Sequence, residues 1–363
     1  MADSRAYDGV VSAVEWLDSL SPWPRDGFGL DRMRALLAEL GDPQEAYPAV
    51  HVVGTNGKST ATITIEQLLL SDGLSVGSTI SPHVEGWSER IRVDGAEADF
   101  EEAVGRVREP AERIGATQFE IVTAAALAAF AHAGVDAAVA EAGLGGRHDA
   151  TNVLRTRVVL LTNVGLEHTD VLGDTVEAIA REKLAVAKEG AIVVLPHETY
   201  APLVAGSEVR IGGPREAAEA FVGHPIAADP QVSLPGRLER REGEVRDGAH
   251  NPDGVRYLVE RLPPGDHTVV ASILADKAVD DMLRELRRVG ARFVATRSSS
   301  PRALPALDLA ELARRHFPLV EAVDDPGEAL ARAHELGEPV LVTGSLYLLG
   351  DLAQAERSAS WPA

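Results

Sequence analysis

The sequence predicts an α/β protein of two domains, each built around a mostly parallel β-sheet. Short apolar runs alternate with helical patterns along most of the chain, and this alternation is typical of right-handed βαβ units. The apolar run Val50–Val53 leads directly into a glycine loop and then into a helical pattern, so that a buried strand, a turn and a helix follow one another. At 363 residues the chain is also too long for one average hydrophobic core.

The domain boundary is expected where these patterns change. Periodicity fades between His197 and Leu234, and a smaller set of strands and helices then follows. We therefore predict an N-terminal P-loop domain at 1–234 and a smaller, Rossmann-like α/β domain at 235–363. The dipeptide Pro235–Gly236 is the expected hinge between them.

Apolar periodicity and turn residues define the elements of the N-terminal domain. The Pro and Gly residues of SPWPRDGFG separate the first two helices, Gly73 ends the third, and Asp94-Gly95 marks a hairpin. The expected helices span 11–20, 30–41, 58–70, 99–114, 119–133 and 174–188. The expected strands span 50–53, 75–80, 136–142, 157–164 and 191–196, with the hairpin at 90–95.

The same criteria define the C-terminal domain, where helices and strands alternate strictly. The expected helices span 252–262, 278–290, 307–317, 327–337 and 346–356. The expected strands span 267–274, 291–298, 319–325 and 339–345.

The composition restricts the classes of function. The chain has no cysteine, which excludes disulfides and thiolate chemistry, and its net charge of −21 would repel a nucleic-acid backbone. The first twenty residues are polar and acidic, and no apolar run approaches the roughly 20 residues that a membrane span requires. We expect a cytoplasmic protein that binds neither nucleic acid nor membranes.

The glycine loop after the first strand predicts a phosphate-binding site. Backbone N–H groups at the start of the following helix would face an anion, and Lys58 would bring a positive charge to the outer phosphates. The common G-x-x-x-x-G-K-[ST] pattern needs a glycine at position 52, where Val52 stands, so Gly54 supplies the turn instead. A shortened loop of this kind indicates a subset of nucleotide-binding enzymes.

Polar residues or glycines lie at the carboxyl ends of four of the expected strands, at Gly54, Ser81, Glu141 and His168. Parallel α/β sheets bind ligands at the carboxyl ends of their strands, so we expect these four loops to meet at one edge. A carboxylate such as Glu141 suits Mg²⁺ at that position. Each residue taken singly also has a purely structural interpretation, such as a loop cap, and the expected convergence is what favours a binding site.

A set of motifs in a fixed order extends this interpretation. They are GTNGKST, SPH, SERIRVDG, QFEIVTAAA, EAGLGGRHDATNV, GLEHTDVLGDTVEAIAREK, LPGR, DGAHNPDG, ADK and VLVTGSLYLLG. Between about Leu30 and Leu352 the chain thereby resembles the folylpolyglutamate synthase and dihydrofolate synthase family, within the Mur ligase superfamily of ATP-dependent ligases. The resemblance implies a Mur-ligase-type ATP-binding domain followed by a Mur-ligase-type C-terminal domain.

The resemblance also implies ATP and Mg²⁺, with two ions expected, as cofactors. The residues implied to bind the nucleotide are Gly54, Thr55, Asn56, Gly57, Lys58, Ser59, Thr60, Asn152, Arg237, Asp247 and His250. Ser81, Glu141 and His168 are the implied metal ligands, and Lys183 would hold a second ion if it is carbamylated. The implied catalytic residues are Lys58, His168 and Lys183.

The acceptor part of the site departs from the family pattern. The candidate substrate residues are His83, Trp87, Arg90, Phe119 and Arg147. The family's F-N-E-R-I is here W-S-E-R-I, and the segment between Pro196 and Leu234 is shorter than its counterpart and lacks a G-x-H-Q-x-x-N-A helix. Aromatic residues make up only 4% of the chain, which leaves few that could stack on a pterin.

The implied reaction converts a carboxylate into an acyl phosphate with ATP and couples it to an amine. The first hypothesis is a dihydrofolate synthase or folylpolyglutamate synthase that adds L-glutamate to a pteroate or folate. The altered acceptor part supports a second, a relative that joins another carboxylic acid to another amine. The third is a non-catalytic nucleotide-binding protein, which Lys183 argues against. We expect a monomer that acts on small molecules.

Overall fold

The computed structural model describes residues 11–22, 24, 27–263 and 265–360 and divides into two compact units. The first unit comprises Met1–His83 and Trp87–Val232, and the second comprises Val84–Gly86 and Ser233–Ala363. The expectation of a polar N-terminus falls largely outside the described residues, as does part of the expected loop SPWPRDGFG. None of the described helices is both long and apolar enough to cross a lipid bilayer.

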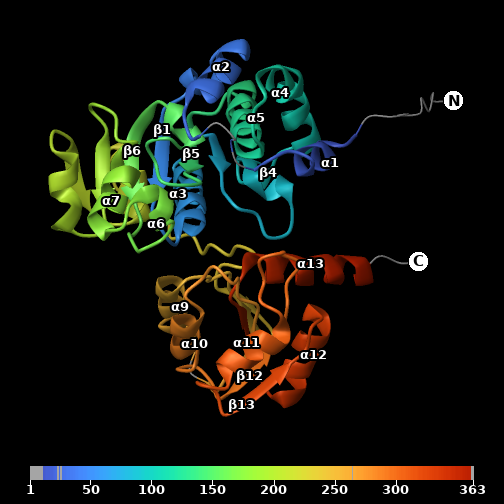
Figure 1. The fold of residues 1–363 in the computed structure, drawn as a ribbon. Helices are drawn as coiled ribbons and strands as arrows, with labels where there is room; N and C mark the ends of the chain where they lie inside the picture. The colour runs from blue at the N-terminus through green and yellow to red at the C-terminus, as the bar shows by residue number, and fades with distance from the viewer. Residues whose placement is uncertain (1–10, 23, 25–26, 264, 361–363) are drawn as a thin grey trace. The chain divides into compact units, whose positions relative to one another are not determined.

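Within the described residues, eight strands form the sheet of the first unit in the order β4-β3-β2-β5-β1-β6-β7-β8 (Figure 1). Their bounds are β1 Ala49–Val53, β2 Val76–Thr79, β3 Ile91–Val93, β4 Ala96–Glu97, β5 Ala137–Glu141, β6 Thr156–Leu161, β7 Ile192–Leu195 and β8 Glu208–Ile211. Neighbouring strands from β2 to β8 pair in parallel, whereas β3 and β4 add an antiparallel hairpin at one edge. The expected mostly parallel sheet is confirmed.

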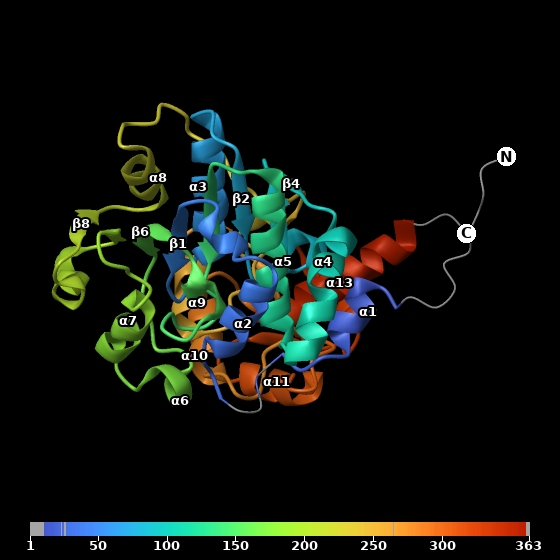
Figure 2. The same ribbon diagram turned by 90° about the horizontal axis from the view of Figure 1, so that it is seen from above.

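Helices cover both faces of this sheet. Their bounds are α1 Ala13–Asp18, α2 Asp31–Glu39, α3 Lys58–Ser71, α4 Phe100–Ile114, α5 Gln118–Ala133, α6 Thr169–Leu172, α7 Val176–Leu184 and α8 Pro214–Val222. Figure 2 shows α3 and α8 on one face of the sheet and α4 and α5 on the other. Short 3₁₀ helices occur at η1 Pro43–Glu45, η2 Trp87–Arg90, η3 Ala150–Val153 and η4 Glu198–Val204.

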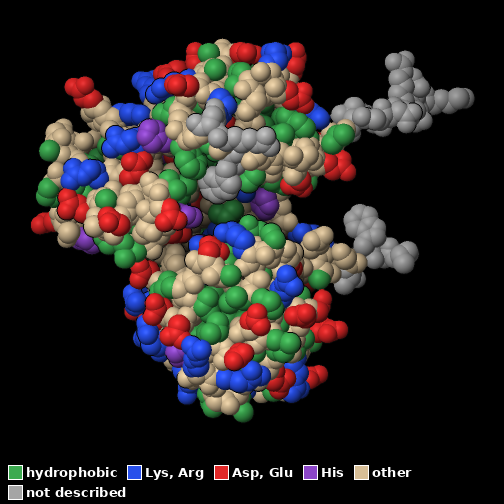
Figure 3. Space-filling model, viewed as in Figure 1, with side chains coloured by type: hydrophobic (Ala, Val, Ile, Leu, Met, Phe, Trp, Pro, Cys, Tyr) green, Lys and Arg blue, Asp and Glu red, His purple; other side chains and the backbone are tan. Residues whose placement is uncertain are grey.

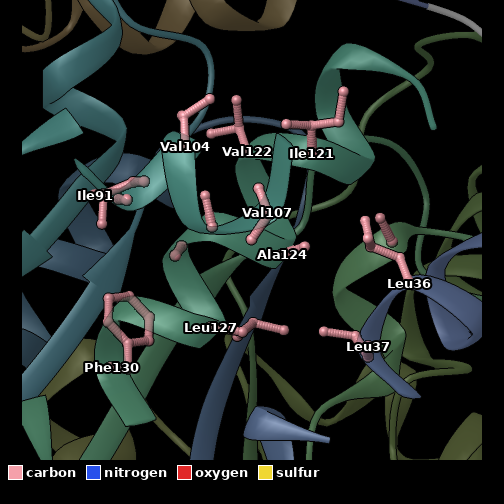
Figure 4. Packing of buried hydrophobic residues seen from close by; sticks show 14 of the residues in the cluster. Leu36, Leu37, Ile91, Val104, Val107, Ile121, Val122, Ala124, Leu127 and Phe130 are labelled. Carbon is pink, nitrogen blue, oxygen red and sulfur yellow. The ribbon is translucent and has the colours of Figure 1, made fainter. Parts of the chain in front are cut away.

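The core between α5 and the sheet shows why these residues form these elements. Helix α5 begins with a capping box in which Thr117 and Glu120 satisfy each other's backbone N–H groups. Its residues Leu127 and Phe130 are fully buried among aliphatic side chains of α2 and α4 (Figure 4). Strand β2 passes so close that a Cβ atom at Gly77 would lie 2.4 Å from the ring of Phe130. A glycine is therefore required at this point of the sheet.

In the first unit the structure differs from the expected elements most clearly in two places. The segment between β7 and the end of the first unit, where periodicity fades, contains η4, β8 and α8. Strand β8 has no buried residue, so alternation of apolar and polar residues could not reveal it. Helix α7 spans Val176–Leu184 rather than 174–188, and its N-cap is Thr175, whose hydroxyl accepts a hydrogen bond from Ala178 N.

In the described part of the second unit, six strands form a sheet in the order β13-β12-β11-β14-β10-β9. Their bounds are β9 Glu239–Arg241, β10 Glu244–Arg246, β11 Thr268–Ala271, β12 Arg292–Ala295, β13 Leu319–Ala322 and β14 Val340–Thr343. The helices are α9 Pro252–Val259, α10 Val279–Leu286, α11 Ala306–Ala313, α12 Pro326–Leu336 and α13 Leu346–Ser360. Helices α9, α10 and α11 pack on one face, and α12 and α13 pack on the other.

The alternating α/β pattern expected for this unit is confirmed, and the sequence analysis missed the antiparallel pair β9 and β10. Five of their six residues are Arg or Glu, so these strands have no apolar pattern by which the sequence could predict them. Gly236 of the expected hinge has φ 62°, and a Cβ atom there would lie 2.5 Å from Leu349. Gly236 is thus packed inside the second unit, a few residues after the division between the units at Val232.

The acidic residues behind the net charge of −21 are spread along the sequence rather than gathered into a tail. Figure 3 shows Asp and Glu side chains interspersed with Lys and Arg side chains on the visible face of each unit. Many of these side chains form ion pairs within helices, such as Arg106 with Glu102 and Arg181 with Glu177. Such exposed pairs each contribute little to stability, about 0.3 kcal/mol.

The contact at Gly77 leads to a test of the packing. Gly77→Ala should lower the free energy of unfolding by about 1–3 kcal/mol, because the added methyl group overlaps the ring of Phe130. Urea denaturation measures the change. Gly105→Ala is the matched control, because nothing lies within 4 Å of the corresponding Cβ position in α4. It should stabilise the helix by up to about 1 kcal/mol, and equal effects of the two substitutions would contradict the account.

Candidate functional site

The loop between β1 and α3 has the geometry of a phosphate-binding loop. Gly57 is the N-cap of α3 with φ 78°, a conformation that glycine adopts without strain, and Lys58, Ser59 and Thr60 form the first turn. Their N–H groups lie at the helix start, where an α-helix has no internal acceptors for them. The N-terminus of α3 therefore presents donors and a positive dipole end to an anion.

Residues after β6 hold this loop in place. A Cβ atom at Gly54 would lie 1.9 Å from Oγ1 of Thr162, so only glycine fits where the loop leaves β1. Asn163 binds the backbone of Asn56 twice, accepting from its N–H at 2.9 Å and donating to its carbonyl at 3.1 Å. Thr162 Oγ1 also donates to the Asn56 carbonyl at 2.8 Å. The sequence analysis missed Thr162 and Asn163, which it placed inside the expected strand 157–164, whereas β6 ends at Leu161 and both residues directly follow it.

Glu141 joins three of the expected loops. It is 3% exposed at the end of β5, and the sheet register pairs it with Val52 of β1. One carboxylate oxygen accepts a hydrogen bond from Ser81 N at 3.0 Å, and the other lies 3.9 Å from Nζ of Lys58. The structure thereby brings together Lys58, Ser81 and Glu141, as the sequence analysis expected.

Lys183 of α7 reaches the same loop from another side. Its side chain is buried, and its Nζ donates to the carbonyl of Gly54 at 2.7 Å. Burial, together with the nearby charge of Lys58, lowers the pKa of Lys183 to about 8, while Glu167 opposes this shift. A substantial neutral fraction near pH 8 is the condition for a lysine to react with CO₂. Glu167, which the sequence analysis did not single out, thus lies within electrostatic range of Lys183.

His168 lies in the loop after β6, at the N-cap of α6, with φ 49°. Its side chain is 43% exposed, and its Nε2 lies 3.5 Å from Glu167. No hydrogen bond or ion pair among the described residues connects it to Glu141 or Lys58. Its expected role as a metal ligand stays a prediction.

The glycine loop after β5 rests on α7 and on a buried carboxylate. A Cβ atom at Gly146 would lie 2.4 Å from the carbonyl of Lys183. Asp149 accepts hydrogen bonds from Leu144 N at 2.8 Å and Thr151 N at 3.0 Å, and burial raises the pKa of this carboxyl group. The loop is thereby fixed against the helix that carries Lys183.

Two site candidates in this loop already have structural partners. The Asn152 side chain accepts from Nζ of Lys188 at 2.6 Å and donates to the carbonyl of Arg147 at 2.9 Å. Arg147 forms an ion pair with Glu182 of α7 at 3.1 Å and is half exposed. Arg147 can therefore change partner more readily than Asn152.

The acceptor candidates His83, Trp87 and Arg90 form one cluster. Arg90 Nε donates to Nδ1 of His83 at 2.9 Å, and its guanidinium lies 4.4 Å from the centroid of the Trp87 ring. Burial lowers the pKa of His83 to about 3, with the Arg90 charge adding to the effect. Trp87 also stacks on Phe100 at 6.2 Å and donates from its indole to Asp18 at 3.1 Å. The lowered pKa keeps His83 neutral, and the hydrogen bond from Arg90 orients its ring.

Phe119, the remaining acceptor candidate, lies under the glycine loop after β5. A Cβ atom at Gly143 would lie 2.6 Å from its ring. Phe119 is also packed against the core of the first unit. In this structure Phe119 therefore supports the glycine loop from below.

The candidates in the second unit lie in the loop after β10 and, for Arg237, just before β9. Asp247 accepts hydrogen bonds from Leu238 N at 2.7 Å and Ala249 N at 2.8 Å, and burial raises its pKa while Arg237 and His250 oppose the rise. His250 Nδ1 lies 2.9 Å from the carbonyl of Gly248. The structure thus brings Arg237, Asp247 and His250 together within this unit.

The donor set of the first unit fits a magnesium ion by its chemistry. Glu141 offers a buried carboxylate next to the backbone of Ser81, and hard cations prefer such oxygen ligands. Among the described residues, no three His, Asp or Glu side chains form a cluster that could hold a metal by themselves. Phosphate and hydroxyl oxygens would therefore have to supply part of the coordination.

Comparison with known proteins supports one family. The Mur ligase middle domain model matches residues 52–202, and the model named Mur ligase, glutamate ligase domain matches residues 236–346. The dihydrofolate synthase/folylpolyglutamate synthase of Bacillus subtilis is 30% identical over 89% of this chain and 94% of that protein. The folylpolyglutamate synthase of Lacticaseibacillus casei is 31% identical over 89% of this chain and 93% of that protein.

This chain belongs to the folylpolyglutamate synthase/dihydrofolate synthase family. Solved structures agree with the assignment. The chain is similar to Escherichia coli FolC in complex with DHPP and ADP, with a TM-score of 0.85 and 26% identity over 97% of this chain and 99% of that one. It is also similar to the Mycobacterium tuberculosis folylpolyglutamate synthase complexed with ADP and AMPPCP, with a TM-score of 0.84 and 28% identity over 94% of this chain and 96% of that one. The predicted fold and family are thus confirmed, and the chain is an ATP-dependent ligase that uses a divalent metal ion.

The pKa of Lys183 predicts a pH dependence of stability. Its pKa is about 8 in the folded protein against 10.5 for the exposed side chain. The unfolded chain therefore binds more protons between these values, and the stability of the protein relative to Lys183→Met should rise with pH through this window. The whole rise is about 3 kcal/mol.

Urea denaturation of the metal-free protein in CO₂-free buffer at pH 7 and pH 10.5 measures this difference. Arg181→Met is the matched control on the same helix, since an exposed arginine keeps its charge throughout. A difference between wild type and Lys183→Met that does not change with pH would show that Lys183 is not desolvated.

Proposed function

We propose that this member of the family joins L-glutamate to dihydropteroate or to a folate, forming an amide at the expense of ATP. The observation that carries the proposal is the arrangement of Lys58, Ser81 and Glu141 at the carboxyl edge of the first sheet. A positive charge, a hydroxyl-bearing residue and a buried carboxylate there are what a metal-bound triphosphate requires. The relatives named above supply the substrate class.

The first step is transfer of the γ-phosphoryl group of ATP to a carboxylate of the acceptor. The bond between the β-phosphate oxygen and the γ-phosphorus breaks, and a bond from the carboxylate oxygen to that phosphorus forms, giving ADP and an acyl phosphate. The N-terminal turn of α3 and Lys58 bind the triphosphate and oppose the negative charge on the transferring oxygens. The amine of glutamate then attacks the acyl carbon, and phosphate leaves.

Magnesium supplies charge neutralisation at the β- and γ-phosphates when it is bound. We assign one ion to Ser81, Glu141 and His168, and a second to Lys183 in carbamylated form. The lowered pKa of Lys183 makes its amine available for the carbamate, which forms by attack of the neutral amine on CO₂ with loss of one proton. Without the carbamate, Lys183 holds the carbonyl of Gly54 and so fixes the loop.

The remaining candidates are assigned by the unit that carries them. We assign His83, Trp87, Arg90, Phe119 and Arg147 to the acceptor. Asn152, Arg237, Asp247 and His250 are assigned to the nucleotide, together with the loop Gly54–Thr60. We further propose an ATP-binding domain at 1–234, a C-terminal domain at 235–363, a monomeric enzyme and a cytoplasmic location.

The contacts of Trp87 favour a second candidate function, with a different acceptor. Its indole stacks on Phe100, lies beside Arg90 and binds Asp18, so a pterin ring would have to displace some of these groups. The second candidate is therefore a ligase for a different carboxylic acid, with the same chemistry at the phosphates.

One assay separates these functions. Release of ADP is measured with dihydropteroate plus glutamate, with tetrahydrofolate plus glutamate, and with a panel of other acids and amines. We expect turnover of a pteroate or folate. Turnover of other acids alone would select the second candidate, and hydroxylamine should trap the acyl phosphate as a hydroxamate in either case. Absence of ADP release with every acid would contradict both.

Replacement of Lys183 tests the proposed carbamate. Lys183→Ala and Lys183→Arg should each lower kcat by at least about 100-fold, because neither can form a carbamate that holds a metal ion. Arg181→Ala, on an exposed turn of the same helix, should change kcat by less than about twofold. Steady-state assays at saturating ATP measure both. Full activity of Lys183→Ala would remove the carbamate from the mechanism.

A further inference from the structure

We propose that His51 is a positioning residue that holds the glycine loop 143–149 in place. It acts through Thr151 and Asp149, and the loop in turn lies against Lys183 of α7. All of these residues belong to the first unit. The inference rests on the proposed function, because the loop and Lys183 are part of the site assigned to that reaction.

His51 occupies a strand position that would suit an apolar residue. It lies in the middle of β1, paired with Ala140 of β5 and Val159 of β6, and it is fully buried. Its neighbours Val50 and Val52 point to the opposite face of the sheet and pack in the core with α3. A polar ring buried at this depth costs free energy unless its nitrogen atoms find partners. We therefore looked for the groups that the ring contacts.

A chain of hydrogen bonds leads from His51 to the glycine loop. Nε2 of His51 lies 2.8 Å from Oγ1 of Thr151, and this hydroxyl donates to Oδ1 of Asp149. The other carboxylate oxygen of Asp149 accepts from Leu144 N at 2.8 Å, inside the glycine loop. The side chains of His51, Thr151 and Asp149 are all buried, so water does not compete for these hydrogen bonds.

The number of available protons determines the direction of this chain. Burial lowers the pKa of His51 to about 3, and the charge of Lys188 adds to the effect, so the ring is neutral and carries one N–H group. Thr151 has a single hydroxyl proton, which it donates to Asp149, so towards His51 its oxygen can only accept. The proton of His51 is therefore on Nε2. Nδ1 is left as an unprotonated acceptor that has no partner among the described residues.

The glycine loop transmits this constraint to Lys183. Gly146 packs so tightly on α7 that a Cβ atom there would lie 2.4 Å from the carbonyl of Lys183. Lys183 in turn donates from Nζ to the carbonyl of Gly54 at 2.7 Å, and Gly54 directly follows β1, the strand that carries His51. The contacts thus form a closed ring from β1 through the glycine loop and α7 back to the end of β1. A shift of the glycine loop must therefore move Lys183 relative to the phosphate-binding loop.

Removal of the Thr151 hydroxyl breaks this ring of contacts and leaves Lys58, Ser81 and Glu141 in place. Thr151→Val should lower kcat about tenfold, because misplacement by about 1 Å can lower a rate by up to about 100-fold. Thr151→Ser keeps the hydroxyl and should retain kcat within about twofold. Release of ADP by the full chain measures both, at saturating Mg²⁺, ATP, glutamate and whichever pteroate or folate the enzyme turns over.

Thr62→Val is the matched control for this substitution. Thr62 lies in α3 and is fully buried, and its hydroxyl has no hydrogen-bond partner among the described residues. The same change there removes an unpaired polar group, so neither thermal stability nor kcat should fall. Equal kcat in Thr62→Val and Thr151→Val, or a Thr151→Ser variant as slow as Thr151→Val, would overturn the positioning role.

Two further readouts need no turnover. Heteronuclear NMR of the nitrogen-labelled protein should show the ring of His51 with a proton on Nε2 and none on Nδ1, and the signals that His51→Gln removes identify this ring. Amide hydrogen exchange of peptides covering residues 143–151 should be at least about tenfold faster in Thr151→Val than in Thr62→Val. A proton on Nδ1, or equal exchange in the two variants, would contradict the proposed chain of hydrogen bonds.

These readouts separate the inference from the proposed function. A wild-type protein that consumes no ATP with any pteroate or folate would contradict the proposed function, and the ring proton and the exchange rates would still decide the role of His51. If Thr151→Val does not fold, His51→Leu and His51→Gln replace it, because only glutamine keeps an N–H donor near the position of Nε2. The loss of kcat should then occur in His51→Leu alone, and equal kcat would overturn the positioning role.

Discussion

The burial of one carboxylate, Glu141, is the constraint on which the site depends. A charged group that is 3% exposed is unfavourable unless donors and opposite charge surround it, and here Ser81 N and Nζ of Lys58 do so. These two partners come from the loops after β2 and β1. The parallel register of β1 and β5, which pairs Val52 with Glu141, places them within reach. The sheet therefore determines where the phosphate-binding loop meets the carboxylate.

Around this carboxylate, the loops are held mainly through the backbone. Asn163 and Lys183 bind N–H or carbonyl groups of the loop between β1 and α3. At position 54, beside Thr162, glycine is the only residue type that fits. Such contacts position N–H donors before a ligand arrives, so that little reorganisation is needed on binding. Lys183 is the exception to a purely structural role, because its buried amine has a lowered pKa and can change its chemical state.

The sequence was sufficient for features that depend on local pattern. Apolar runs and glycines predicted the strand, turn and helix around Lys58, the α/β class and the family, and the loop ends at Ser81 and Glu141 meet as expected. Side-chain direction could not be predicted in this way. The stacking of Trp87 on Phe100 was not foreseen, and its expected contact with a substrate stays a prediction. The hydrogen bonds of Asn163 to Asn56 depend on which loops are neighbours in space, which the sequence does not show. Strand β8 has no buried residue and therefore no apolar pattern.

The most direct measurement of the central claim is calorimetric binding of ATP to wild type and Glu141→Gln, with and without Mg²⁺. If Glu141 holds the metal against the phosphates, the substitution should weaken binding of the magnesium complex at least tenfold, equivalent to about 1.4 kcal/mol. Binding of metal-free ATP should be unchanged or tighter, because Lys58 loses a competing negative charge. Equal affinity of the two proteins for the magnesium complex would contradict the account.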